Sequence, residues 1–253
     1  MTDTPPVVID QWSDLRRYTA ARIALGRTGA SLPAKEVLSF ALAHAQARDA
    51  VHVPLDTEAL VSQLASNGTE ALQIRSRAQN RTAYLSRPDL GRRLDDESAK
   101  KLRETPGKGA DLLFVLSDGL SSSAVQKHAV PLLHELRILL AAYRWAPLLI
   151  ATQARVALAD EAGELLNAKL AINLIGERPG LSSPDSLGAY ITFKPCVGRN
   201  DAERNCISNI RPEGLGLAEA TQQIAELVRA ALKLSLTGVN LRLNPALPSI
   251  STE

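Results

Sequence analysis

The feature that most constrains the fold is a repeated pattern of apolar strand, loop and helix in the second half of the chain. Residues 112–116, 148–151 and 170–175 are short apolar runs, and helical segments over 121–143 and 159–167 separate them. This alternation predicts an α/β fold with a parallel, Rossmann-like sheet. Right-handed crossovers should bring the loops after Ser117, Thr152 and Gly176 to one edge, where such sheets bind ligands.

The first half of the chain has a helical pattern instead. We expect helices near 12–22, 33–48, 56–66 and 95–104, with short strands and a basic loop over 72–94. A breaker run, Thr105 to Gly109, marks the best boundary. The prediction is therefore a mostly helical region, 1–105, followed by a Rossmann-like domain, 106–253, that includes a helix over 217–233 and a tail without a predicted fold.

Composition excludes several classes of protein. The chain has 253 residues, enough for a sizeable core, and its 29 basic and 27 acidic side chains give a net charge of +2. This balance indicates no nucleic-acid partner. Two cysteines, Cys196 and Cys206, are too few for a disulfide framework, and the apolar runs are too short to span a bilayer. We expect a cytoplasmic protein without a membrane partner.

Common ligand motifs are absent or stand in the wrong context. Gly107-Lys108-Gly109 lacks the glycine spacing of a Walker motif, and Gly214-Leu215-Gly216 follows Arg-Pro-Glu rather than an apolar strand. His134-Glu135 begins like a zinc-protease helix, but Ile138 stands where the second histidine is required. We therefore expect no metal site.

The strongest sign of a site is a polar stretch, residues 172–212, that begins with a buried strand. Gly176, Pro179 and Gly180 end that strand, and Glu177 and Arg178 stand between these breakers. Two charged side chains are thus displayed where an open α/β sheet places its ligand. A long segment without helical periodicity is more often functional than idle.

Several phrases of the sequence, in fixed order, resemble one family. They are TAARIALGRTG at 19–29, TAYLSRPDLGRRL at 82–94, VLSDGLSSSAV at 115–125, GERPGL at 176–181, SLGAY at 186–190 and DAERNCISNIRPEG at 201–214. The chain is similar to the small (light) subunits of ethanolamine ammonia-lyase, and the resemblance covers residues 12–241.

That resemblance implies an ammonia-lyase that uses adenosylcobalamin. In the family, a large subunit with a β/α barrel binds ethanolamine, and the small subunit covers the cofactor from its nucleotide-loop side. Homolysis of the Co–C bond yields a radical, and the products are acetaldehyde and ammonia. The resemblance also implies a dodecamer of six large and six small subunits, an interface role for region 1–105, an association with bacterial microcompartments, and no catalytic residue on this chain.

Three positions correspond to cofactor contacts in the family: Val156 in QARVAL, Glu177 in GERPG and Cys206 in RNCISN. Glu177 would accept hydrogen bonds from the amide arms of the corrin, or it would pair with Arg178 or cap a helix. Val156 would act through its backbone or by apolar packing. Cys206 would act through backbone atoms or close packing, and its alternative is a place in the core.

A second set of residues is predicted to contact the cofactor or a partner subunit: Asp118, Arg155, Arg178, Ser208 and Asn209. RPDLGRR at 87–93 is predicted to be an interface anchor, and a solvated loop is its alternative. None of the four histidines stands in the Asp-x-His-x-x-Gly motif of proteins that replace the lower base of cobalamin, so that base should stay on cobalt. Two rival functions remain, a stand-alone Rossmann-type binding protein and an assembly subunit without cofactor contact.

Overall fold

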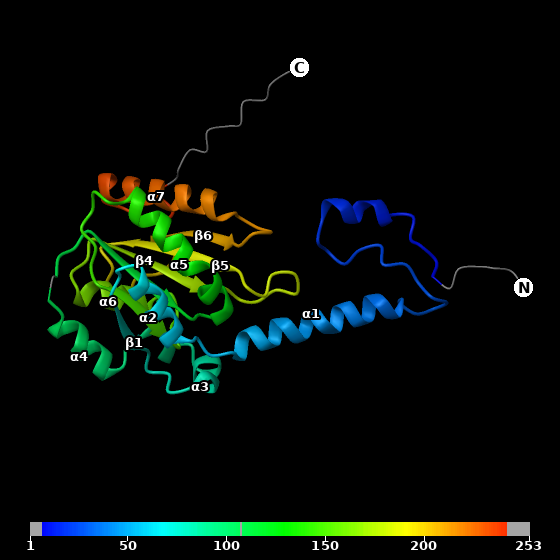
Figure 1. Ribbon diagram of the computed structural model, residues 1–253, viewed down its shortest axis with the longest axis horizontal. Coiled ribbons are helices and arrows are strands. Elements are labelled where there is room, and N and C mark those ends of the chain that lie inside the picture. Colours follow the sequence, from blue (N-terminus) through cyan, green and yellow to red (C-terminus); the bar gives the residue numbers. More distant parts are fainter. Residues whose placement is uncertain (1–6, 107, 242–253) are drawn as a thin grey trace, which may run out of the picture.

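The computed structural model describes residues 7–106 and 108–241, and Figure 1 shows a sheet with helices on both faces and an N-terminal arm that projects from it. The six strands have the order β1-β3-β2-β4-β5-β6. Their bounds are β1 Ala71–Arg75, β2 Leu112–Ser117, β3 Leu148–Thr152, β4 Leu170–Gly176, β5 Leu187–Phe193 and β6 Arg204–Ile210. The strands from β1 to β4 pair in parallel, which confirms the predicted α/β fold.

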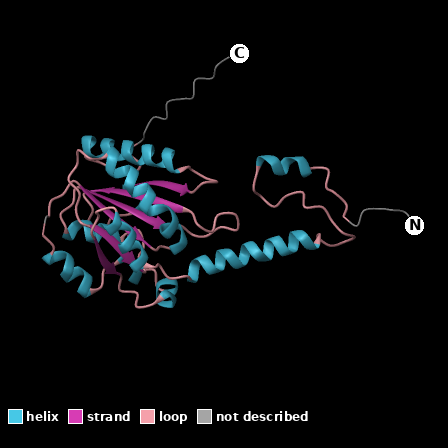
Figure 2. Cartoon of the chain, in the orientation of Figure 1, coloured by secondary structure: helices cyan, strands magenta, loops and turns pink. Residues whose placement is uncertain are grey.

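Helices cover both faces of the sheet (Figure 2), and an apolar layer lies between the sheet and the helices on each face. In β2, Leu112, Phe114 and Leu116 belong to one layer, while Leu113 and Val115 belong to the other. Successive side chains of a strand point to opposite faces, so a strand covered on both sides must be apolar throughout. This is why the run Leu-Leu-Phe-Val-Leu identified a central strand.

The covering helices begin and end close to their predicted limits. One face carries α2 (Thr57–Ser66), α5 (Ser122–Leu139) and α7 (Leu217–Leu234), and the other carries α4 (Asp96–Glu104) and α6 (Leu158–Leu165). Asp56 caps α2 by accepting from the Ala59 N–H at 2.9 Å, and Asp95 caps α4 by accepting from the Ser98 N–H at 2.8 Å. These local signals explain why the sequence predicted both helices.

Two strands of the sheet were not predicted. β5 and β6 lie within the stretch 172–212, which the sequence presented as a polar loop, and they extend the sheet in antiparallel fashion. β6 contains one extra residue relative to β5, because Leu187 pairs with Ile210 whereas Ala189 pairs with Ile207. The result is a β-bulge, with Asn209 at a φ of 59°.

The predictions for the first half of the chain need correction in detail. Segment 72–94 holds one strand, the helix α3 (Arg81–Ser86) and the 3-10 helix η2 (Leu90–Arg92), not several strands. In place of the helix predicted near 12–22, the structure has the 3-10 helix η1 (Ser13–Tyr18). Another 3-10 helix, η3 (Asp201–Glu203), precedes β6. Strand β1 pairs with β3 although it precedes residue 105, and the division into regions 1–105 and 106–253 stays a prediction.

The predicted second helix is present as α1 (Ala34–His52), but its apolar side chains are not buried within the chain. Only Ala43 and Ala50 of this helix are buried, whereas Leu38 is 69% exposed. Figure 1 shows α1 extending away from the sheet, and the segment that precedes α1 and carries η1 also lies away from the sheet. Arg16 of η1 is 3.5 Å from Glu36 of α1. No helix of the described residues is long and apolar enough to cross a bilayer. The predicted tail lies partly outside the described residues, which end at 241.

Candidate functional site at the carboxyl edge of the sheet

The carboxyl ends of β2, β3 and β4 meet at one edge of the sheet, as the sequence predicts. Their parallel pairing places the three following loops together, and these loops surround a cavity of about 420 Å³. It is lined by Tyr84, Gly119, Leu120, Arg155, Val156, Ile175, Gly176, Glu177, Arg178 and Tyr190. We call this space the edge cavity. It has the position where open α/β sheets bind their ligands.

Glu177 is held in the edge cavity by three hydrogen bonds. Its backbone N–H donates to the Ser186 carbonyl at 2.9 Å. Its Oε2 accepts from the Ser186 hydroxyl at 2.5 Å and from the Asn209 N–H at 3.0 Å. The Asn209 N–H is available for this bond because the bulge removes it from the strand ladder.

The backbone of Gly188 packs closely against the Glu177 side chain. A methyl group built on Gly188 would lie 2.9 Å from Glu177 Oε1 and 3.1 Å from its Cγ. Within the described residues, Oε1 accepts no hydrogen bond, whereas Oε2 accepts two. The carboxylate is thus oriented by one oxygen and offers the other as an acceptor.

Val156 also lines the edge cavity, in the loop between β3 and α6. Its carbonyl accepts from the side-chain amide of Asn173 at 3.3 Å. Asn173 belongs to β4, and its Oδ1 is buried without a hydrogen-bond partner among the described residues. A buried amide oxygen without a donor is costly, but Asn173 is not among the residues that line the edge cavity.

Cys206 does not line the edge cavity. It lies on β6 opposite Tyr190 of β5, and Tyr190 is the residue of this pair that reaches the cavity. Partial desolvation raises the pKa of the Cys206 thiol, and the Glu177 carboxylate adds to that rise. Desolvation likewise raises the pKa of the Tyr190 hydroxyl. A thiol with a raised pKa is a poor nucleophile at neutral pH.

Asp118 does not line the edge cavity, and its carboxylate contacts the loop after β3. Its carboxylate accepts from the backbone N–H groups of Gln153 at 2.8 Å and Ala154 at 2.9 Å, and it lies 3.5 Å from Arg81 Nη1. Burial raises the pKa of this carboxyl group to about 6, against the effect of these donors. Asp118 therefore ties the loop after β2 to the loop after β3.

Tyr84, which the sequence analysis missed, forms part of the cavity wall. It is fully buried, donates to the Ala154 carbonyl at 3.2 Å, and has the guanidinium groups of Arg81 and Arg155 at 4.7 and 4.3 Å from its ring. Burial raises the pKa of its hydroxyl. Tyr84 comes from a short helix outside the strand-loop pattern, so only the TAYLSRPDL phrase could have indicated it.

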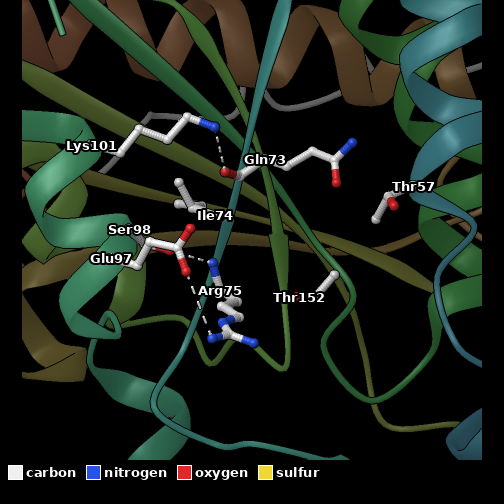
Figure 3. A pocket seen from close by; sticks show the side chains of 8 residues that line it. All are labelled: Thr57, Gln73, Ile74, Arg75, Glu97, Ser98, Lys101 and Thr152. Carbon is white, nitrogen blue, oxygen red and sulfur yellow. Dashed lines mark hydrogen bonds and ion pairs between the residues drawn. The ribbon is translucent and has the colours of Figure 1, made fainter.

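A second cavity, of about 370 Å³, lies beside the edge strand β1 (Figure 3). Its charged groups contact one another or the strand. Lys101 donates to the Gln73 carbonyl at 3.2 Å, Arg75 Nη2 lies 3.9 Å from Glu97, and the Arg75 N–H donates to Ser98 at 3.0 Å. These contacts tie α4 to β1 and cover an exposed sheet edge.

Comparison with known proteins decides the family. Residues 9–242 match the family described as Ethanolamine ammonia-lyase light chain (EutC). The chain belongs to this family. The ethanolamine ammonia-lyase small subunit of Azotobacter vinelandii is 54% identical over 247 residues, which cover 96% of this chain and 92% of that protein.

Two further relatives are also named ethanolamine ammonia-lyase small subunit. The small subunit from Pseudomonas syringae pv. tomato is 56% identical over 237 residues, covering 91% of this chain and 82% of the relative. The one from Xanthomonas campestris pv. campestris is 52% identical over 255 residues, covering 99% and 93%. The predicted resemblance is thus confirmed over nearly the whole chain.

Some of the remaining predicted positions lie at the edge cavity, and the others lie elsewhere on the chain. Arg155 and Arg178 line the edge cavity, and Asn209 donates to Glu177. Ser208 is exposed on β6. In RPDLGRR, Arg93 pairs with Glu161 of α6 at 3.0 Å, while Arg87 pairs with Asp89 on the surface. The described residues contain no group of three or more His, Cys, Asp or Glu placed to hold a metal ion.

Proposed function

We propose that this chain is the small subunit of an ethanolamine ammonia-lyase and binds adenosylcobalamin together with a large subunit. The observation that carries this proposal is the oriented carboxylate of Glu177 in the edge cavity, with Oε2 held by Ser186 and Asn209 and Oε1 available. Membership of the light-chain family supports it.

The residues of the edge cavity fit the chemistry of a corrin rim. That rim carries amide arms, each of which can donate and accept hydrogen bonds. Glu177 Oε1, in the lining of the edge cavity, is an acceptor for an amide N–H. Ile175, Leu120 and the Tyr190 ring give the cavity an apolar part. Cys206 would act through Tyr190 or through backbone atoms, since its thiol is outside the cavity.

The proposed reaction is the deamination of ethanolamine to acetaldehyde and ammonia. Adenosylcobalamin, when bound, supplies the radical chemistry, and the protein supplies binding and orientation. We assign no catalytic residue to this chain, because the edge cavity contributes acceptors, cations and packing surface. The substrate site belongs to the large subunit in this proposal.

The N-terminal arm, residues 7–52, is proposed as part of the large-subunit interface. It exposes large apolar side chains that contact little of its own chain, among them Trp12 at 61% and Tyr18 at 73% exposure. An exposed apolar surface of this kind is typical of an interaction site. The proposed assembly is a dodecamer of six large and six small subunits in the cytoplasm, with an association with bacterial microcompartments also proposed.

Equilibrium titration of the purified two-subunit complex with cyanocobalamin tests this function. Glu177→Ala should weaken binding by about tenfold to a hundredfold, since a hydrogen bond to a charged acceptor contributes roughly 1.5–3 kcal/mol. Assembly, measured by sedimentation, should not change. Unchanged affinity in the variant would refute the role of Glu177.

The same titration separates the two rival functions. A stand-alone binding protein would bind the corrin without the large subunit. An assembly subunit without cofactor contact would form the complex, and Glu177→Ala would then have no effect on the corrin. The proposed function requires both subunits for binding and requires Glu177 for full affinity.

A further inference from the structure

Arg155 is built into the wall of the edge cavity by contacts on three sides. Its backbone N–H donates to the Gly91 carbonyl at 2.8 Å, and its Nη2 donates to the Tyr84 carbonyl at 3.1 Å. Its guanidinium lies 4.3 Å from the centre of the Tyr84 ring. A methyl group on Gly91 would approach Arg155 Cγ to 2.8 Å, so a glycine there is needed for this packing. The charge is therefore held in a fixed place.

This fixed cation has no anionic partner in the part of the chain that the structure describes. Only Nη2 of its three guanidinium nitrogens donates a hydrogen bond, and Nε is buried without an acceptor. Arg81 and Arg93, by contrast, each have a carboxylate partner. Arg81 contacts Asp118 and donates to the Gly119 carbonyl at 2.9 Å, and Arg93 pairs with Glu161.

The charges that line the edge cavity leave one positive charge in excess. Arg155 and Arg178 are both present in the lining, and Glu177 is its single carboxylate. Neither arginine forms an ion pair within the described residues. A guanidinium that is oriented, partly desolvated and unpaired is suited to a phosphate-type oxyanion, with which arginine forms strong charge-assisted bonds.

We infer that Arg155 binds the phosphodiester of the nucleotide loop of cobalamin. This inference rests on the proposed function and extends it to a second part of the cofactor. The phosphodiester carries one negative charge, which matches the excess positive charge of the lining. Glu177 and Arg155 would then recognise different features, the amide-bearing rim and the nucleotide loop.

The test compares cyanocobalamin with aquacyanocobinamide, which has the corrin but lacks the nucleotide loop and its phosphodiester. Both are titrated into the two-subunit complex carrying either wild-type Arg155 or Arg155→Gln. We expect the variant to bind cyanocobalamin about tenfold to a hundredfold more weakly, while its affinity for cobinamide changes less than about twofold. Arg137→Gln is the matched control, because Arg137 also stacks on an aromatic ring, 4.9 Å from Trp145, and does not line the edge cavity.

Equal losses for the two corrins would overturn the inference, since they would indicate a structural role for Arg155. Weaker assembly with an unchanged ratio of the two affinities would also overturn it, because Arg155 would then pair with the large subunit. Inorganic phosphate is the third probe. If it binds the wild-type complex but not the Arg155→Gln complex, and does so without displacing cyanocobalamin, the arginine serves a free anion and the inference fails. If the wild-type complex binds neither corrin, the proposed function itself is wrong.

A second measurement does not depend on cobinamide. The ³¹P NMR signal of bound cyanocobalamin should shift between the wild-type complex and Arg155→Lys, which retains the charge but not the planar guanidinium. The Arg137→Lys complex should give the wild-type signal. Identical signals from the wild-type and Arg155→Lys complexes would contradict a direct contact with the phosphodiester.

Discussion

At the scale of single residues, the edge cavity depends on small side chains that let charged ones approach. Gly188 leaves room for the Glu177 carboxylate, which a Cβ at this position would meet at 2.9 Å. Gly91 does the same for Arg155. Both charged side chains are therefore positioned by the absence of a neighbouring Cβ as well as by hydrogen bonds.

Gly188→Ala should displace Glu177 and weaken cyanocobalamin binding by the two-subunit complex about tenfold. The new methyl group would contact the flexible side chain of Glu177, which can move away. The free energy of unfolding should therefore fall by about 1 kcal/mol or less. Equilibrium titration and urea unfolding measure the two quantities.

Gly176→Ala is the contrasting variant on the neighbouring strand. Its methyl group would lie 2.0 Å from the Ser121 carbonyl oxygen and 2.6 Å from that of Asp118, both of which are backbone atoms. We expect it to lower the free energy of unfolding by about 1–3 kcal/mol or more. Equal free energies of unfolding for Gly188→Ala and Gly176→Ala would show that it makes no difference whether the new methyl group meets a flexible side chain or rigid backbone.

At the scale of helices and strands, β2, β3, β4 and the helices that cover them were predictable because their signals are local, whereas the place of β1 in the sheet was not predicted. The run at 112–116 is apolar at every position, and Asp56 and Asp95 cap the helices that follow them. The meeting of three loops at one edge follows from parallel pairing and right-handed crossovers. Val156 and Glu177 could therefore be placed near each other from the sequence.

The antiparallel strands could not be predicted in this way. β6 exposes Cys206, Ser208 and Asn209, so its pattern is polar and resembles a loop. Its pairing depends on contacts with β5, and the bulge at Asn209 disturbs the expected alternation. For the same reason the position of Cys206, outside the cavity and opposite Tyr190, was not apparent from its spacing.

One ion pair links two elements that are distant in sequence and should make stability depend on pH. Glu161 of α6 accepts from the Arg93 guanidinium at 3.0 Å and from the Leu94 N–H at 2.8 Å. Burial alone would raise the pKa of Glu161, but these donors outweigh it and hold the pKa below its ordinary value of 4.5.

Because this pKa is lowered on folding, the interaction stabilises the fold above pH 4.5 and is lost as pH falls through the lower, folded-state pKa. Glu161→Gln should therefore be less stable than the wild type at pH 7, and the difference should shrink below pH 4.5. Urea unfolding at a series of pH values measures this. A difference that stays constant down to pH 3 would show that the carboxylate charge is unimportant.

At the scale of the whole molecule, the N-terminal arm and the sheet domain differ in how they use apolar residues. The sheet domain buries them in two layers, whereas α1, which extends away from the sheet (Figure 1), exposes Val37, Leu38 and Leu42. The sequence predicted this helix correctly, but most of its apolar side chains are not buried against its own chain. An interface with the large subunit is the proposed use.

Leu38→Asp should weaken the association of the two subunits by about tenfold or more, since a buried interface anchor would acquire a charge. It should leave the unfolding free energy of the isolated chain within about 0.5 kcal/mol of the wild type, because the side chain is exposed there. Sedimentation and urea unfolding check both points. Ile138→Asp, an exposed apolar position on α5, is the control and should preserve association.

The proposed enzyme consists of this chain and a large subunit and uses adenosylcobalamin to deaminate ethanolamine. The most direct measurement is acetaldehyde formation from ethanolamine after co-expression of the chain with the large subunit of its own organism. Acetaldehyde should form only when both subunits and adenosylcobalamin are present. No acetaldehyde from ethanolamine, and no product from any other short amino alcohol, would contradict this proposal.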